Sequence, residues 1–540
     1  MKNAGNDSQT LLRRSLQNNY NLFLMLPVFG GAGLIAGLML PDMQKKFIDA
    51  MLKDSSSVWW LLLAVLLLTG AAAAGRWGLN WWGGRCSEQV YNRMKLLFAQ
   101  KLLELPSEFF LRHPSGYLTA RLELDTANSN YFYSYEYFYP YLGTLSMLGA
   151  WIMLCLQSWY AGILTAAALG VQLLLLRRLM PRNYALHQES GELSAGNYGT
   201  LHQYFSNIER VKTQAGEEKA IEQIGKSYEK SLSLALKMLK LQLNSGILLR
   251  IAPNFIKLIL LLAGVWEYRQ GNWSAGEIWA VVMYANLVFS PAAGVFNNLL
   301  ERAGALAALQ RVEQLYRLIP EAHLQDGIEL EQGITRIEFS GVSFGYDENE
   351  LVIKDCSFEL KSGELLAVIG RSGSGKSTLI GLLLQLYVPR WGKIFYNDCG
   401  AEKYNLRNLR RHIGYVSQSP QFFSGSLLEN LGERISPEQA TAVLRQVGGE
   451  ELIERLTEPL GEQGRYFSAG ERLRIAVARE LLRNCEVLIF DEPTANLDEF
   501  HADILMRQLK DLSNERIIFI ITHDMKITAY ADKILNLGTE

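Results

Sequence analysis

The chain has 540 residues, 49% of them hydrophobic, and a formal net charge of −2 at pH 7. This length allows two or three domains. The near-neutral charge argues against nucleic acid as a partner, because nucleic-acid-binding proteins usually carry a strongly basic face. The apolar residues are concentrated in the first half, which indicates an integral membrane protein. The five cysteines are odd in number and widely spaced, so we expect unpaired thiols rather than a disulfide framework or a metal site.

The first half contains six apolar segments long enough to cross a bilayer core of about 30 Å. Arg13 and Arg14 precede the first segment and no small-residue cleavage site follows it, so we expect this segment to be retained. The sequence therefore predicts an all-α transmembrane domain of six helices, at residues 21–41, 57–74, 138–156, 161–180, 247–266 and 278–299.

The loops between these segments indicate the orientation. The loops after the second and fourth segments are long and rich in Arg and Lys, whereas those at 157–160 and 267–277 are short and carry few charges. Positively charged loops favour the cytoplasmic side, so both termini are predicted to lie in the cytoplasm. Lys45, Lys46 and Lys53 in the first external loop weaken this asymmetry.

The chain changes character after the last apolar segment. Residues 306–332 are charged and are expected to form a helical connector, and from residue 334 short β-rich runs alternate with helical ones. This pattern predicts a soluble α/β domain. We place the transmembrane domain at residues 1–325 and the second domain at 326–540.

Residues 370–377 fill every fixed position of the pattern G-x-x-x-x-G-K-S, which binds nucleoside triphosphates through its backbone amides. An apolar run at 365–369 predicts a buried strand before the loop, and residues 377–386 predict a helix after it. Lys376 is expected to reach the β- and γ-phosphates of ATP, and Ser377 to ligate Mg²⁺. The expected ATP-binding residues of this loop are Gly370, Arg371, Ser372, Gly373, Ser374, Gly375, Lys376, Ser377 and Thr378.

Two carboxylates follow an apolar strand more than a hundred residues later. Asp491 is expected to hold Mg²⁺ through water, and Glu492 to orient or deprotonate the water that attacks the γ-phosphate. His523 follows an apolar strand at 517–522 and is a candidate γ-phosphate sensor, because parallel sheets place ligand contacts at the carboxyl ends of their strands. Each motif has a structural alternative. The loop at 370–377 could be a chance glycine turn, Asp491 and Glu492 a pair of solvated acids, and His523 a structural histidine.

Together these residues resemble the ATP-binding cassette (ABC) superfamily, in particular exporter-type half-transporters that fuse a membrane domain to a nucleotide-binding domain. The resemblance implies an α/β P-loop ATPase domain with ATP and Mg²⁺ as cofactors. It also implies that Tyr346 stacks on adenine and that Gln418, in Tyr-Val-Ser-Gln, contributes to catalysis and senses the metal. The expected metal ligands are Ser377, Gln418 and Asp491.

Other segments extend the resemblance over nearly the whole chain. The loop that receives the coupling helices is matched by residues 421–430. The loop before the signature is matched by residues 461–464, and the loop that crosses the dimer interface by residues 495–498. In the membrane half, the residues that match the two cytoplasmic coupling segments are Phe109, Phe110, Gly116, Leu118, Arg121 and Asp125 in the first, and Ile208, Val211, Lys212 and Glu217 in the second.

The family signature Leu-Ser-Gly-Gly-Gln reads Phe-Ser-Ala-Gly-Glu here, at residues 467–471. Ser468 and Gly470 are retained, and the resemblance implies that they contact ATP held by the phosphate loop of a second subunit. Glu471 would bring a carboxylate near the triphosphate, which is unfavourable unless Arg472 or Arg474 screens it. Two alternatives stay open: a heterodimer with one slow ATP site, and a homodimer whose signature has drifted.

The resemblance implies an ATP-driven transporter in a bacterial inner membrane, with a cytoplasmic nucleotide-binding domain. It would work as a dimer by alternating access and export a small molecule, a peptide or an amphipathic compound. The alternative functions are import or lipid flipping by the same fold, and an ATP-gated regulator.

Two features of the membrane half bear on the cargo. Tyrosine occupies every odd position from 131 to 141, which favours an interfacial aromatic belt, with stacking on cargo as the alternative. One helix face carries Arg250, Asn254 and Lys257. If this face lines a cavity, it would suit an anionic or zwitterionic cargo. The alternative is that Arg250 snorkels to the membrane interface.

Overall fold

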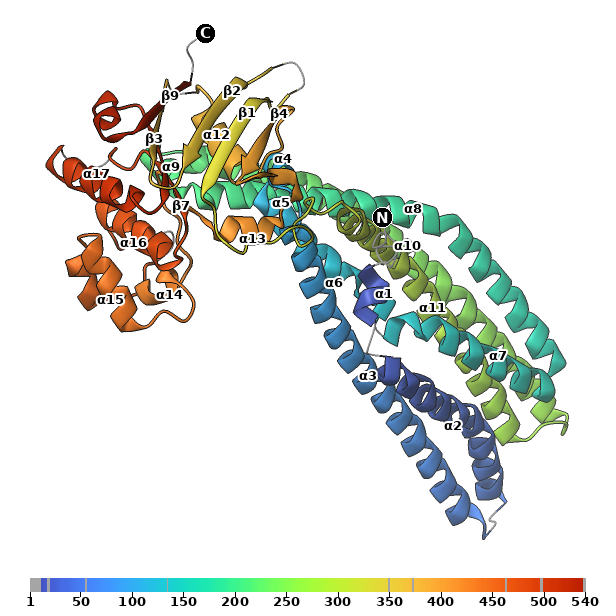
Figure 1. The fold of residues 1–540 in the computed structure, drawn as a ribbon. Helices are drawn as coiled ribbons and strands as arrows, with labels where there is room; N and C mark the ends of the chain where they lie inside the picture. The colour runs from blue at the N-terminus through green and yellow to red at the C-terminus, as the bar shows by residue number, and fades with distance from the viewer. Residues whose placement is uncertain are drawn as a thin grey trace. The chain divides into compact units, whose positions relative to one another are not determined.

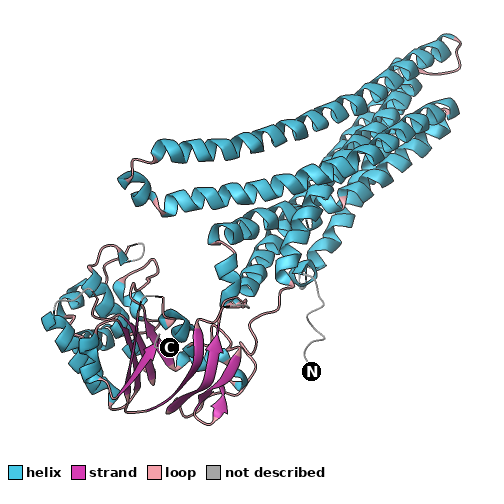
Figure 2. Ribbon diagram, turned by 90° about the horizontal axis from the view of Figure 1, so that it is seen from above, coloured by secondary structure: helices cyan, strands magenta, loops and turns pink. Residues whose placement is uncertain are grey.

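The computed structural model describes residues 11–16, 20–53, 56–133, 135–347, 350–371, 373–461, 464–495 and 499–537. The chain divides into two compact units, Met1–Leu105 with Phe110–Leu318, and Pro106–Phe109 with Ile319–Glu540. The first unit is helical and the second combines strands with helices (Figures 1 and 2). The predicted order of an all-α region followed by an α/β domain is therefore confirmed. Pro106–Phe109, of which Phe109 belongs to the first predicted coupling segment, group with the second unit.

In the described part of the helical unit, six long helices are joined by short ones. The long helices are α2 (Tyr20–Leu52), α3 (Val58–Leu103), α7 (Tyr139–Gln157), α8 (Trp159–Ser206), α10 (Glu217–Arg269) and α11 (Ala275–Tyr316). The short elements are α1 (Leu11–Leu16), α4 (Ser107–Arg112), α5 (Ser115–Ala120), η1 (Arg121–Asp125), α6 (Thr126–Asn128), η2 (Ser129–Tyr133), η3 (Tyr135–Tyr137) and α9 (Ile208–Thr213).

Four helices of the described chain are long and apolar enough to cross a membrane: Leu24–Leu52, Val58–Leu103, Tyr139–Gln157 and Trp159–Ser206. The fifth and sixth predicted segments lie within α10 and α11, which are long helices outside that set. A helix of 46 residues such as α3 is roughly 70 Å long, more than twice the hydrocarbon core, so it extends well beyond a bilayer. The number of six spans stays a prediction.

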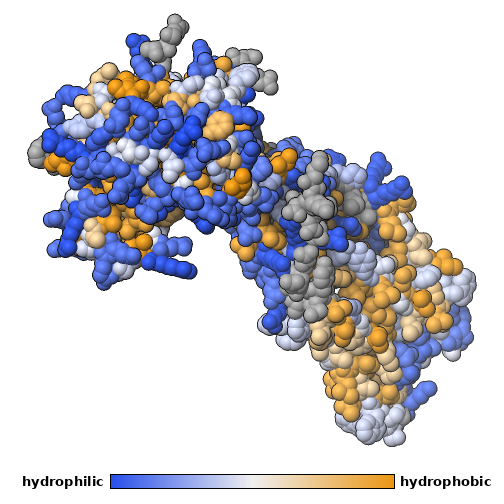
Figure 3. All heavy atoms as spheres, viewed as in Figure 1, coloured by the Kyte–Doolittle hydropathy of each residue, from blue (hydrophilic) through white to orange (hydrophobic). Residues whose placement is uncertain are grey.

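Large apolar side chains cover the outside of the helical unit. Hydrophobic residues gather over α2 and α7 on the face seen in Figure 3. Trp59 is 77% exposed and Leu174 is 70% exposed. Water would oppose this exposure by about 25 cal/mol per Å² of apolar surface, whereas lipid does not. The unit is therefore suited to a bilayer.

The tyrosine-rich stretch forms two short 3₁₀ turns, η2 and η3, before α7 begins. Tyr131 is buried, and its hydroxyl donates to Asn298 Oδ1 at 2.7 Å, so this ring belongs to the packing of the helices and not to an interfacial belt. On the fifth predicted segment, Asn254 is exposed and Lys257 is half-buried, while the Arg250 side chain lies outside the described residues.

Two sheets organise the second unit. The first has the order β2-β1-β4-β5 and is antiparallel, and the second has the order β6-β7-β8-β3-β9 and is parallel. The strands are β1 (Arg336–Phe344), β2 (Ile353–Lys361), β3 (Leu365–Gly370), β4 (Trp391–Tyr396), β5 (Cys399–Gly400), β6 (Ile413–Val416), β7 (Val487–Asp491), β8 (Ile517–Thr522) and β9 (Lys533–Leu537). The helices are α12 (Lys376–Leu383), α13 (Leu406–Arg411), α14 (Leu427–Leu431), α15 (Pro437–Gln446), α16 (Ala469–Leu482) and α17 (Glu499–Ser513), with short turns η4 (Ala401–Lys403), η5 (Glu450–Arg455) and η7 (Met525–Tyr530).

The parallel sheet forms where the sequence is continuously apolar. All six residues of β8 are buried, as are the first five of β3, because helices cover both faces of a parallel sheet. The runs at 365–369 and 517–522 were predicted to be strands, and both predictions are confirmed. Parallel pairing of β6, β7, β8 and β3 brings their carboxyl ends to one edge of the sheet. The phosphate loop follows β3, and Gln418, Glu492 and His523 follow β6, β7 and β8.

The predicted helical connector at 306–332 is only partly helical. α11 continues without a break to Tyr316, and residues 317–335 contain no helix or strand. Pro320 disfavours helical geometry at the residue before it, and Gly327 and Gly333 adopt φ of 144° and 73°. Charge alone did not reveal these breaks.

Candidate functional site

The loop between β3 and α12 has the backbone geometry of a phosphate cradle. Gly373 and Gly375 adopt φ of 83° and 94°, which a residue with a Cβ rarely reaches, and Gly375 caps the N-terminus of α12. A Cβ on Gly375 would also lie 3.1 Å from the side chain of Val352. The amide groups at the start of α12 can therefore converge on an anion. Ser372, one of the predicted contacts, lies outside the described residues.

Lys376 lies along this loop. Its Nζ donates to the carbonyl oxygens of Gly370 and Arg371 at 2.7 Å and 3.1 Å. Both acceptors are neutral, so an incoming phosphate offers the ammonium group a stronger, charged acceptor. The side chain of Ser374 turns back against Gly370, where a Cβ would overlap the Ser374 hydroxyl. Gly370 is thus needed for the shape of the loop.

Glu492 is held between two polar side chains. Gln418 Nε2 donates to Glu492 Oε2 at 2.8 Å, and His523 Nδ1 lies 3.1 Å from Glu492 Oε1. These three residues follow β6, β7 and β8, three neighbouring strands of the parallel sheet. Glu492 adopts φ of 49°, an unfavourable region for a residue other than glycine. The backbone is anchored there because Glu492 N donates to Ile521 O at 2.8 Å.

Asp491, the last residue of β7, is half-buried, whereas Gln418 and His523 beside Glu492 are exposed. Burial raises the pKa of its carboxyl group, and the hydroxyl of Tyr415, which donates to Asp491 Oδ2 at 3.3 Å, acts in the opposite direction. Tyr415 was not among the predicted site residues. Its place in the apolar strand β6 gave no sign that its hydroxyl would face Asp491 across the sheet.

One cavity of about 780 Å³ brings most of the predicted residues together. This volume is within the range of small-molecule sites. Tyr346 is 47% exposed at this cavity, and its hydroxyl lies 3.1 Å from Thr378 Oγ1. The full lining is Tyr346, Val352, Gly373, Gly375, Lys376, Ser377, Thr378, Gln418, Asp491, Glu492 and His523.

The signature residues lie outside that lining. Ser468 caps α16: its hydroxyl accepts from Glu471 N at 3.2 Å, and its own N–H donates to Glu471 Oε2 at 2.6 Å. This reciprocal arrangement is a capping box. Arg455, from η5, donates to Glu471 Oε1 at 2.7 Å, and its guanidinium lies 4.0 Å from the centre of the Phe467 ring. The two substituted side chains, Phe467 and Glu471, therefore share one cationic partner.

The expectation that Arg472 or Arg474 screens Glu471 is met only in part. Arg474 contributes through its charge while it donates to Glu451 at 2.5 Å, but the direct bond to Glu471 is made by Arg455. Bonds from Ser468 and the charges of Arg455 and Arg474 outweigh partial burial, the largest single influence, and hold the pKa of Glu471 below its usual value. Arg455 was missed because it belongs to a different element, 16 residues earlier in the chain.

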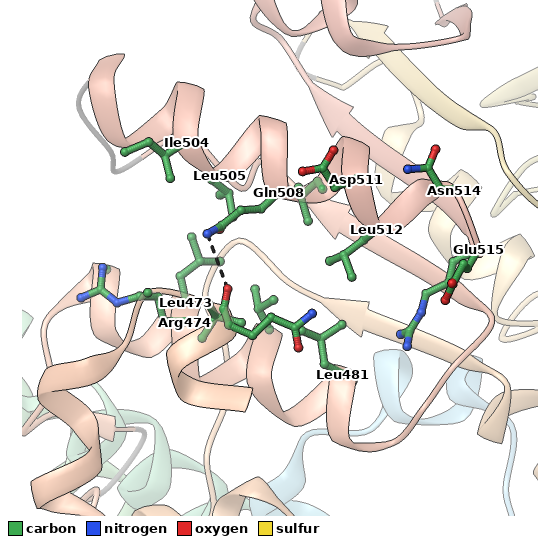
Figure 4. A pocket seen from close by; sticks show the side chains of 17 residues that line it. Leu473, Arg474, Leu481, Ile504, Leu505, Gln508, Asp511, Leu512, Asn514 and Glu515 are labelled. Carbon is green, nitrogen blue, oxygen red and sulfur yellow. Dashed lines mark hydrogen bonds between the residues drawn. The ribbon is translucent and has the colours of Figure 1, made fainter. Parts of the chain in front are cut away.

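A second cavity of about 570 Å³ lies between α16 and α17 (Figure 4). Leu473 and Leu481 face it from α16, and Leu505 and Leu512 from α17, with polar side chains around the opening. Gln508 donates to the carbonyl oxygen of Gln446 across it. Its lining contains Gly470 but no residue of the phosphate loop, so it is separate from the candidate site.

Two family models match the chain. The model described as ABC transporter transmembrane region matches residues 23–292, half of the chain, and the model described as ABC transporter matches residues 353–495. The chain belongs to the ABC transporter family. Both regions lie in one chain, as the resemblance of the sequence indicated.

Curated relatives of this ABC transporter align over most of its length. It is 28% identical to a probable multidrug resistance ABC transporter ATP-binding/permease protein, YheH, of Bacillus subtilis, over 84% of this chain and 68% of that protein. It is 26% identical to YwjA, an uncharacterized ABC transporter ATP-binding protein of Bacillus subtilis, over 96% and 92%. It is 28% identical to an ATP-dependent lipid A-core flippase of Xylella fastidiosa, over 84% and 78%.

The fold of this ABC transporter is similar to a solved structure of a bacterial Atm1-family ABC exporter with ATP bound. The TM-score is 0.80 at 21% identity, covering 98% of this chain and 94% of that one. The protein is an integral membrane protein of exporter type, with a nucleotide-binding ATPase domain coupled to transport. Exporters with one copy of each region dimerise.

Proposed function

We propose that this protein exports a small molecule, a peptide or an amphipathic compound across a bacterial inner membrane, driven by ATP hydrolysis in its cytoplasmic nucleotide-binding domain. The observation that supports this most directly is the position of Glu492. Its carboxylate lies between Gln418 and His523 in the cavity that also contains Lys376. A carboxylate beside a phosphate cradle is placed to orient or deprotonate a water molecule for in-line attack.

The other side chains of the cavity have complementary roles in this proposal. Lys376 moves from its carbonyl acceptors to the β- and γ-phosphates, and the amides from Gly373 to Thr378 surround the phosphate oxygens. Tyr346 stacks on the adenine ring, because its exposed face lies at the same cavity. His523 reports the γ-phosphate through its bond to Glu492.

The residues present fit a Mg²⁺ ion. The Ser377 hydroxyl, the Asp491 carboxylate and the Gln418 amide oxygen line one cavity, and oxygen is the ligand that Mg²⁺ prefers. Gln418 uses its nitrogen toward Glu492, which leaves its oxygen for a metal. Phosphate oxygens of the nucleotide would complete the coordination. Bound Mg²⁺ would neutralise charge on the phosphates.

The second subunit would be another half-transporter, and its signature would complete the ATP site. Ser468 and Gly470 lie outside the lining of the nucleotide cavity in their own chain, which agrees with contact to ATP in a partner. The native mass of the complex, purified gently from its own host, distinguishes the two alternatives. Twice the chain mass indicates a homodimer, and a different second chain indicates a heterodimer.

Transport is tested in inside-out vesicles with candidate cargo compounds. Lys376→Ala should abolish ATP-dependent accumulation, because the ammonium group is lost from the phosphates. Lys53→Ala, at an exposed position in the first external loop, serves as a control that should accumulate cargo normally. Continued ATP-dependent transport by the Lys376→Ala variant would contradict the proposal.

A further inference from the structure

The helical unit contains a polar cavity in which two arginine side chains face one buried carboxylate. The cavity has a volume of about 590 Å³ and is formed by α5, η1, α6, α8, α10 and α11. At its centre Asp125 accepts from two guanidinium groups, from Arg121 Nη1 at 2.7 Å, and from Arg311 Nη2 and Nε at 2.6 Å and 3.1 Å. One buried carboxylate is thus shared by two cations, of which Arg121 is buried and Arg311 is half-buried.

The hydrogen bonds of this cluster are incomplete. Arg121 is 5% exposed and Asp125 is 3% exposed, so water reaches neither freely. Arg121 Nε and Arg311 Nη1 are buried donors without a partner in the described chain. An unpaired buried donor on a charged group is destabilising, so such donors are normally satisfied by a ligand or by water.

The rest of the lining supplies hydrogen-bonding groups suited to an oxyanion. Ser190, Ser194 and Tyr198 contribute hydroxyl groups from α8, and Asn128 contributes an amide. Glu301 is the other acidic residue of the lining, and it is exposed at the surface rather than buried beside the two arginines. The buried part of the cavity therefore carries one excess positive charge with donors around it.

Gly191 makes room for this arrangement. A Cβ at Gly191 would overlap the guanidinium of Arg311, which would then have to shift away from its place against α8. Gly196, one and a half turns further along the same helix, is exposed and has open space where a Cβ would be added. The two glycines form a matched pair for testing the cavity.

We propose that this cavity binds the carboxylate or phosphate group of a small anionic molecule, which pairs with the free donors of Arg121 and Arg311. Arginine is suited to this role because its planar fork matches both oxyanions. The site is distinct from the ATP site, whose residues all belong to the other compact unit. The proposal concerns binding and does not depend on ATP turnover.

The test measures the melting temperature of the full-length protein in nanodiscs without nucleotide. A Lys376→Ala background weakens phosphate binding at the ATP site. Inorganic phosphate and succinate are added to phosphatidylcholine nanodiscs, with sodium chloride at equal ionic strength as control, and a parallel arm replaces the lipid with phosphatidylglycerol. Stabilisation by the soluble anions identifies a soluble ligand, and stabilisation by phosphatidylglycerol alone identifies a lipid headgroup as the source of the same oxyanion.

We expect Gly191→Ala to weaken the apparent affinity for the effective anion about tenfold, the loss expected for one charge-assisted hydrogen bond, and Gly196→Ala to leave it unchanged. Arg311→Gln, which leaves Arg121 and Asp125 as a balanced pair, should remove the stabilisation by the anion. The proposal is overturned if neither the soluble anions nor phosphatidylglycerol stabilises the protein more than its control. It is equally overturned if the Gly191→Ala and Gly196→Ala variants respond alike, since the anion would then bind outside this cavity.

Discussion

Two glutamates of the nucleotide-binding unit, Glu492 and Glu471, have the same side chain and opposite surroundings. Glu492 has a strained backbone, hydrogen bonds to Gln418 and His523, and a place in the nucleotide cavity. Glu471 begins a helix, closes a capping box with Ser468 and is paired with Arg455. The surroundings of the first carboxylate suit the proposed chemistry, whereas those of the second hold it in the helix cap and the ion pair. The partners of an acid, more than its presence near a motif, indicate what it does.

The largest expected difference between Glu492 and Glu471 is in the effect of a Glu→Gln substitution on ATP turnover. Glu492→Gln removes the proposed base and should lower ATP turnover by about 10²–10⁴-fold while nucleotide remains bound. Glu471→Gln should change turnover by less than about threefold, because a glutamine at this position of a capping box can still accept from Ser468 N–H. Steady-state phosphate release and retention of labelled ATP measure both.

Two outcomes would break the comparison. If Glu492→Gln keeps full turnover, another group activates the water and the proposed role of Glu492 is wrong. If Glu471→Gln alters turnover as much as Glu492→Gln does, the Glu471 carboxylate is not confined to its cap.

The next largest effect is expected at Arg455. Arg455→Ala removes the cation from Glu471, whose side chain is only 17% exposed, and also removes the contact with the Phe467 ring. We expect a loss of about 1–3 kcal/mol in the stability of the nucleotide-binding unit. Thermal unfolding of the full-length protein, followed by a probe in this unit, measures the loss.

A double-mutant cycle sharpens this prediction. Combining Arg455→Ala with Glu471→Gln should cost less than the sum of the single changes by about 1 kcal/mol, because a neutral side chain no longer needs the cation. Additive effects would mean that the two side chains contribute independently despite their 2.7 Å contact.

The sequence predicted the local part of the site well and the long-range part poorly. The loop at 370–377 and the strands around it could be predicted because a few consecutive residues specify them, and a continuous apolar run such as 517–522 identifies a buried parallel strand. Tyr415 reaches Asp491 across 76 residues, and Arg311 reaches Asp125 across 186. Such contacts depend on how elements pack, which periodicity and motif spacing do not encode.

A smaller effect on stability is expected from the strained backbone of Glu492. Glu492→Ala and Glu492→Gly both remove the carboxylate, but only glycine relieves the strain of φ near 49°. The glycine variant should be more stable than the alanine variant by about 1 kcal/mol, seen as a higher melting temperature without nucleotide. Equal stability, or a more stable alanine variant, would show that this backbone is not strained in solution.

The smallest expected effect is the pH dependence contributed by Glu471. Because the pKa of this carboxyl group is held below its usual value of 4.5, the folded state binds its proton less readily than the unfolded chain does. Its contribution to stability is therefore fully present above about pH 4.5 and is lost as the pH falls through the lower, folded-state pKa. Glutamine cannot titrate, so the difference in melting temperature between the wild-type protein and Glu471→Gln should shrink between pH 6 and pH 3.5. Other acids titrate in both proteins and cancel in that difference. A gap that stays constant over this range would place Glu471 in contact with solvent instead of with Ser468 and Arg455, and the contrast with Glu492 would then rest on backbone geometry alone.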